Sequence, residues 1–192
     1  MPYQRSVRDS KTGKEYGLYW YKSIREGTKI HSVYLGKVSL DWHNSTSEQK
    51  RIISVSLKSL PFQDVKGLTD VYISSNLELG YSATFKHNEK GFSIYIAKET
   101  LQKNEIENDK EFVDLVNNVI SHEIGHNVYD KLNSEQKSSW RSFFYEGNNK
   151  ELMPSEYSQN SPMEGFSESY SRIKSNLPIN EKVKIEMEKY LC

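Results

Sequence analysis

The sequence of 192 residues predicts an α+β fold in which a small β module precedes one larger domain. Two tracts carry this prediction. Residues 16–40 are rich in Tyr, Trp, Ile and Val on both sides of a turn at 25–28, which is typical of a β-hairpin. Residues 111–131 place apolar side chains at helical spacing, which indicates a long helix with a broad apolar face. We therefore expect a basic β-hairpin module over residues 1–44 and a mixed domain over residues 45–192.

The remaining elements of the domain are expected to be short. They are a helix from Ser47 that Pro61 stops, strands over 70–74, 81–85 and 91–98, and helices that begin at Ser134, at Ser161 and after Asn180. The start at Ser161 is the best defined, because Ser161 suits the N-cap, Pro162 the first helical position and Glu164 the third. We expect a polar stretch over 41–46 to separate the module from the domain.

The composition bears on where the protein works and on what it could bind. The sequence has no apolar run as long as a membrane span and no apolar segment typical of a secretory signal near its start. Its single cysteine is Cys192, so no disulfide can form within the chain, and we expect a cytoplasmic protein. The net charge is zero, yet residues 1–40 hold eight Lys or Arg against three Asp or Glu. This basic module makes nucleic acid a possible partner, although a hairpin that is simply solvated explains the charge as well.

The chemistry-bearing motif is HEIGH at residues 122–126, inside the long helix. Residues four apart share a helix face, so His122 and His126 can both point at one zinc ion. Glu123 follows the first histidine, where its carboxylate can take a proton from a water whose pKa the metal lowers to about 7. The competing interpretation is a solvated helix face that happens to spell the motif. Because the motif lies among apolar neighbours, where unpaired imidazole and carboxylate groups are costly, a site for one zinc ion per chain is favoured.

The third ligand has to be acidic, because no histidine follows His126. The tract EGFSESY at 164–170 puts Glu164 and Glu168 on one helix face, so one can bind the metal while the other accepts a hydrogen bond from a ligand histidine. Glu164 could instead serve only as the capping-box glutamate after Ser161, which would make Glu168 the ligand. Asp130 is a weaker candidate, four residues after His126.

HEIGH followed by a tyrosine and the pattern E-x-F-[AS]-E-x-[FY] resembles the gluzincin zinc metallopeptidases. The resemblance is to the group with the catalytic domain of anthrax lethal factor, the Pro-Pro endopeptidases and the archaeal minigluzincins. It covers residues 47–175 and implies a zincin-like domain with an active-site helix and a glutamate helix. It implies that Glu164 is the third zinc ligand, which leaves Glu168 to orient a ligand, and that Tyr157, seven residues earlier, stabilises the transition state.

The chemistry of Tyr157 agrees with that role, because a phenol can donate a hydrogen bond to a developing oxyanion. The alternative is packing, since the chain has 13 tyrosines. We expect the strand over 92–97 to form the sheet edge above the cleft, where a peptide substrate can add as a further strand. The alternative is a plain core strand.

The expected function is that of a zinc-dependent endopeptidase with His122, His126 and Glu164 as ligands and Glu123 as general base. The alternative is a latent or regulatory protein with this fold that acts on or binds one dedicated partner, with nucleic acid as one such partner. Latency would follow if residues 176–192 lay near the cleft with Cys192 on the metal. We favour instead a final helix that packs on the back of the domain.

Overall fold

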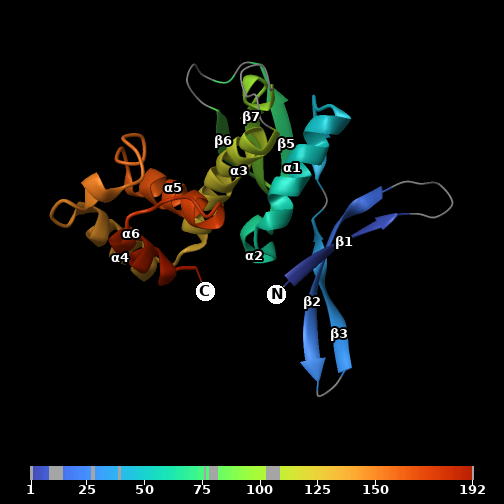
Figure 1. The fold of residues 1–192 in the computed structure, drawn as a ribbon, viewed down its shortest axis with the longest axis horizontal. Helices are drawn as coiled ribbons and strands as arrows, with labels where there is room; N and C mark the ends of the chain where they lie inside the picture. Colours follow the sequence, from blue (N-terminus) through green and yellow to red (C-terminus); the bar gives the residue numbers. More distant parts are fainter. Residues whose placement is uncertain are drawn as a thin grey trace.

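The computed structural model describes residues 2–8, 15–26, 29–38, 40–75, 77, 82–102 and 109–191. It is a mixed α/β structure with two separate sheets (Figure 1). The first sheet is antiparallel, with the strand order β1 (Pro2–Arg8), β2 (Glu15–Glu26) and β3 (Lys29–Val38). The expected hairpin is therefore present as β2 and β3, while β1 is an additional strand that the sequence analysis did not anticipate.

The second sheet lies later in the chain and has the strand order β4-β5-β7-β6. Its strands are β4 (Asp41–His43), β5 (Leu68–Ser74), β6 (Ala83–Asn88) and β7 (Gly91–Ala97). The first three in spatial order run parallel, and β6 pairs antiparallel with β7. The polar break expected over 41–46 is thus only partly a break, because its first three residues pair with β5.

The edge strand next to the helices is β6, not the strand over 92–97. The tract 92–97 lies within β7, which is enclosed between β5 and β6. Its burial agrees with this position, because Ile94 and Ile96 are fully buried. The expected strand over 81–85 begins instead at Ala83, and Tyr81 lies outside the described residues.

The helices begin and end where local chemistry places them. Thr46 caps α1 (Ser47–Ser59) through a capping box with Gln49, and Pro61 then precedes the short α2 (Phe62–Val65). Helix α4 (Ser134–Tyr145) is capped by Asn133 and not by Ser134, since the Asn133 side chain accepts from the backbone of Gln136. Both residue types suit an N-cap, and the sequence alone does not choose between neighbours.

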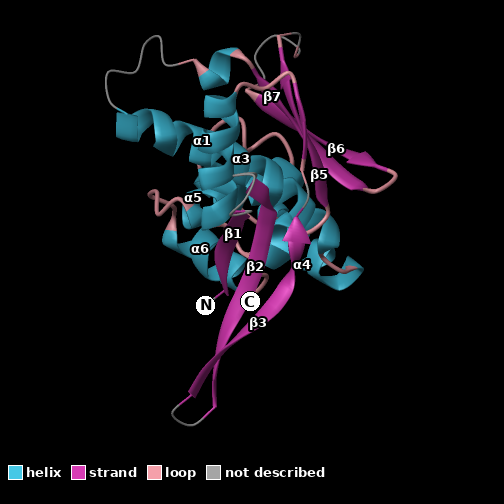
Figure 2. Ribbon diagram, turned by 90° about the vertical axis from the view of Figure 1, so that its right-hand side faces the viewer, coloured by secondary structure: helices cyan, strands magenta, loops and turns pink. Residues whose placement is uncertain are grey.

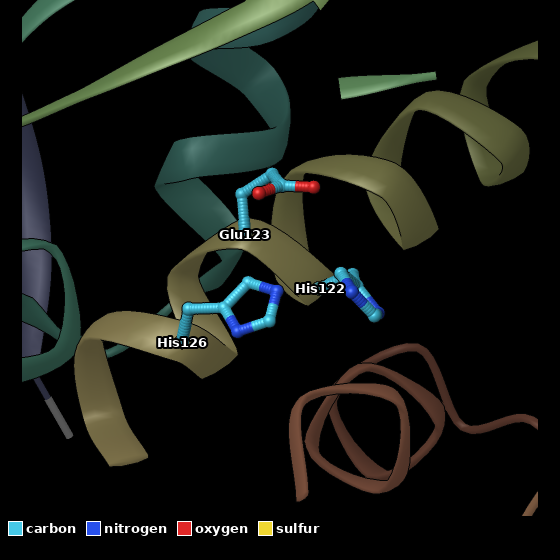
Figure 3. A group of neighbouring side chains, drawn as sticks. All are labelled: His122, Glu123 and His126. Atoms are coloured by element: carbon cyan, nitrogen blue, oxygen red, sulfur yellow. The ribbon is translucent and has the colours of Figure 1, made fainter. Parts of the chain in front are cut away.

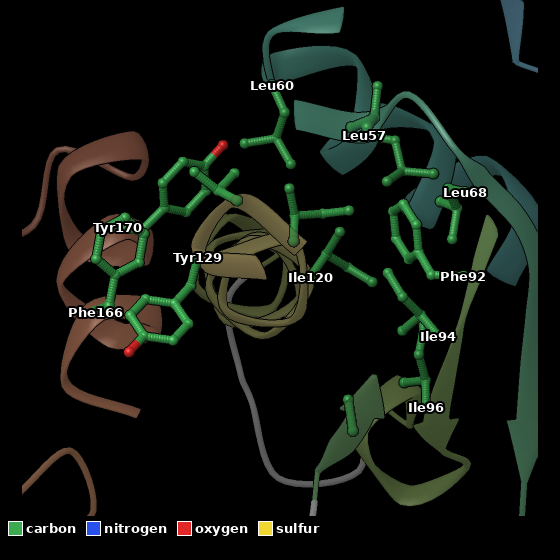
Figure 4. Close-up of a cluster of buried hydrophobic side chains, with 14 of the residues drawn as sticks. Leu57, Leu60, Leu68, Phe92, Ile94, Ile96, Ile120, Tyr129, Phe166 and Tyr170 are labelled. Carbon is green, nitrogen blue, oxygen red and sulfur yellow. The ribbon is translucent and has the colours of Figure 1, made fainter. Parts of the chain in front are cut away.

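Helix α3 (Asp109–Lys131) is the centre of the domain and carries the HEIGH motif. It packs against α1 and the sheet on one side and against α5 (Pro162–Lys174) on the other (Figures 2 and 4). Ile120 and Ile124 are fully buried on α3, and Phe166 and Tyr170 are fully buried on α5. This double packing fixes the position of α3 relative to both the sheet edge and α5.

The last helix, α6 (Glu181–Glu188), packs through its fully buried Val183 and Met187. Just beyond it, Tyr190 contacts the ring of Trp140 on α4, and Lys182 donates to Asn149 in the turn η2 (Asn149–Leu152). Another single turn, η1 (Glu99–Leu101), follows β7. The described part of the C-terminal segment therefore packs on α4 and α5, and Cys192 lies outside the described residues. Among the helices in the described ranges, none combines the length and apolar character that crossing a bilayer requires.

Candidate metal centre

The HEIGH motif brings three side chains together on α3 (Figure 3). The ligand atoms of His122, Glu123 and His126 lie within 4.8 Å of one another. The two imidazole rings are 4.9 Å apart between centroids and nearly perpendicular. Glu123 and His126 are buried, at 5% and 7% exposed. The motif is therefore not a solvated helix face.

Glu164 completes the group from α5. Its Oε2 lies 3.1 Å from Nε2 of His122 and 3.6 Å from Nε2 of His126. Two nitrogens and one oxygen bound tetrahedrally to zinc at 2.0–2.1 Å would be about 3.3 Å apart. The two observed separations lie on either side of this value, so the Glu164 carboxylate lies where a third ligand would stand. The donor set of two imidazoles and one carboxylate also suits zinc.

At the start of α5, Glu164 is both part of the helix cap and part of the site. Ser161 caps the helix by accepting from the backbone N–H of Glu164. The Glu164 side chain turns instead to His122, so a capping role for its backbone does not compete with a ligand role for its carboxylate. The capping box therefore does not exclude a ligand role for Glu164, because its backbone N–H bonds to Ser161 while its carboxylate contacts His122.

Ser167 holds the second histidine. Its Oγ lies 2.9 Å from Nδ1 of His126, and Ser167 is fully buried. A partner on the other ring nitrogen fixes the tautomer and orientation of a ligand histidine. The sequence analysis assigned this task to Glu168, whose carboxylate accepts from Ser155 at 2.5 Å and lies 3.5 Å from Arg172. The signal that could have identified Ser167 is its place one turn after Glu164 on the same helix.

Burial and mutual contacts shift the pKa values of the four ionisable side chains of the site. Burial raises the pKa of Glu123 to about 7 and lowers the pKa of His126 to about 4. The pKa of His122 is raised: burial opposes this, but the bond to Glu164 and the charge of Glu123 outweigh it. The pKa of Glu164 is lowered against its own burial, chiefly by the bond to His122. His126 is thus held in the neutral form that binds metal.

The remaining predicted residues are placed as follows. Tyr157 is 43% exposed, its ring lies 6.0 Å from that of His122, and its side chain forms a hydrogen bond to Glu164 that lowers the pKa of Glu164. Asp130 lies one turn beyond His126 and pairs with His87 of β6 at 2.8 Å. Asp130 is therefore engaged with the sheet edge instead of with the histidine pair.

A hollow of about 280 Å³ opens beside these groups. Its walls come from β6 and the segment before it, from α3, from Tyr157 and from α5. The lining residues are Ser82, Ala83, Asn118, Val119, His122, Glu123, Tyr157 and Glu168. A backbone hydrogen bond of Phe85 in β6 also reaches Glu123, so the edge strand borders the group directly. The site therefore has room for a ligand next to Glu123 and His122.

No protein family, curated protein or solved structure matches the chain in sequence or structure comparisons.

Proposed function

We propose that the chain is a zinc-dependent endopeptidase with a zincin-like domain of the gluzincin type. The observation that carries the proposal is the approach of Glu164 Oε2 to the Nε2 atoms of both His122 and His126, with Glu123 beside them. His122, His126 and Glu164 would hold the metal. When bound, zinc would supply a lowered pKa for water and polarisation of a peptide carbonyl.

Glu123 is the general base in this proposal. It is buried in the wall of the hollow, where a carboxylate can take a proton from the attacking water. The water oxygen then bonds to the carbonyl carbon of the substrate. As the carbon–nitrogen bond breaks, the Glu123 carboxyl passes the proton to the leaving amine, so charge and atoms balance.

Tyr157 and β6 complete the proposed machinery. The ring of Tyr157 stands beside His122 at the hollow, where its hydroxyl can donate to the oxyanion. Strand β6 pairs on one side with β7 and borders Glu123 through Phe85. A peptide that adds along this edge strand would bring its carbonyl to the hollow.

The test is cleavage of a diverse peptide library by the full-length chain. Zinc-loaded protein should cleave a subset of peptides, a chelator should abolish cleavage, and added zinc should restore it. Cleavage that persists after the metal has been removed would overturn the proposal. So would a lack of any cleavage by protein that holds one zinc per chain.

A further inference from the structure

The N-terminal sheet sorts its residues onto two unlike faces. Side chains alternate between the faces of a strand, so the register of the three strands assigns each position to a face. In one row across the sheet the Cα atoms of Arg5, Tyr19 and Lys37 are partners. In the next row on the same face Tyr3 and Tyr34 are both partners of Tyr21.

This face, which we call the tyrosine face, also includes the positions of Val7 and Arg25. It therefore has three Arg or Lys, at positions 5, 25 and 37, together with the four tyrosines of these two rows. The opposite face has a smaller net positive charge. Its positions include Leu18, Trp20, Ile24, Val33 and Val38, with Arg8, Lys22 and Lys29 against Glu15 and Glu26.

Solvent reaches the tyrosine face where its burial is described. Ser23, Arg25, Ile30 and Ser32 are exposed, and Tyr21 is half-buried. All five positions belong to this face by their register. Figure 1 shows β2 and β3 running on past α2, away from α3 and α5, so this sheet extends away from the metal centre.

We propose that the tyrosine face binds single-stranded nucleic acid. Cations on a surface attract the phosphate backbone, and neighbouring aromatic residues offer rings on which unpaired bases stack. The rows Tyr3–Tyr21–Tyr34 and Arg5–Tyr19–Lys37 place both kinds of residue side by side across all three strands. This binding site does not involve the metal centre, so it can be tested separately from the proposed peptidase activity.

The test measures binding of the full-length, zinc-loaded chain to a fluorescein-labelled 20-nucleotide DNA strand of mixed sequence. The same strand in a duplex and unlabelled heparin are the comparison ligands. The single strand should bind more tightly than the duplex. Heparin carries negative charge but no bases, so it should compete for the cations of this face and not for its aromatic rings. If the three cations all contact phosphates, the logarithm of affinity should fall with the logarithm of salt at a slope of up to about −2.

Two matched pairs of variants locate the surface. Arg5→Ala/Lys37→Ala should weaken binding about 10-fold or more at low salt and make the slope shallower by about 1.4. Lys22→Ala/Lys29→Ala removes the same charge from the opposite face and should change affinity by less than about 3-fold. Tyr19→Ala should weaken binding about 10-fold, whereas Tyr19→Phe, which keeps the ring, should not.

Far-UV circular dichroism and zinc content verify that each variant is folded. Equal losses in the two charge variants would contradict the assignment to the tyrosine face. Tighter binding to the duplex, or binding to heparin alone with no dependence on the Tyr19 ring, would overturn the proposal of a single-stranded ligand.

Discussion

Gly125 of α3 lies directly against the backbone of Ser167 of α5, and a Cβ at Gly125 would stand 2.8 Å from the Ser167 Cα. Real Cβ atoms essentially never come so close to backbone atoms. The absence of a side chain at this one position lets α5 approach α3. That approach brings both Glu164 and Ser167 within reach of the two histidines.

Gly125→Ala should therefore separate the helices and weaken the site, although alanine is the better helix former by about 1 kcal/mol. Overpacking of this kind costs about 1–3 kcal/mol, which corresponds to a fall in Tm of roughly 2–4 °C for each kcal/mol. Zinc affinity should fall with it. Gly165→Ala is the control, because the atoms nearest to its Cβ would be side-chain atoms of Phe144 and Met153 and not backbone of α3. An equal loss of zinc affinity in both variants would contradict this account.

Ser167→Ala should reduce zinc affinity about 10- to 100-fold, because His126 loses the partner of its Nδ1. The matched control is Ser169→Ala on the same helix, since Ser169 is also fully buried but its hydroxyl has no hydrogen-bond partner in the described structure. Competition with a chelator measures affinity, and imidazole nitrogen shifts in the NMR spectrum report the His126 tautomer. Unchanged shifts in Ser167→Ala would show that the serine does not orient the ring.

Glu164→Ala should lose more zinc affinity than Glu168→Ala. Glu164 stands 3.1 Å from a ligand nitrogen, whereas Glu168 bonds to Ser155 and Arg172. Glu168→Ala should instead lower thermal stability, because it removes those two contacts. The reverse order of zinc affinities would reassign the third ligand.

Tyr157→Phe should lower kcat by about 10²–10³ with little change in KM, because the hydroxyl acts mainly on the oxyanion. The measurement requires saturating zinc, since Tyr157 also bonds to Glu164. Tyr145→Phe is the control, at another exposed tyrosine outside the hollow. A kcat equal to that of the wild type would leave Tyr157 with a packing role only.

The features that the sequence predicts well are those set by neighbours along the chain. The apolar spacing of α3 and the cap at Ser161 depend on residues a few positions apart, and both are present. The motif at 122–126 likewise follows from helix geometry, because His122 and His126 lie one turn apart.

The features that it misses depend on contacts between distant segments. Strand β1 has few β-branched or aromatic residues and exists through pairing with β2. The sheet edge is β6 and not the expected strand over 92–97, because β7 pairs parallel with β5. No local sequence pattern encodes that pairing. The bond between Ser167 and His126 likewise depends on how closely α5 crosses α3, and hence on Gly125.

The most direct test of the proposed function is turnover of one cleaved peptide by zinc-loaded Glu123→Gln. The amide cannot accept the proton, while His122, His126 and Glu164 remain to hold the metal. The variant should keep one zinc per chain and lose activity by about 100-fold or more. A rate near that of the wild type would show that Glu123 is not the base and would contradict the proposed mechanism.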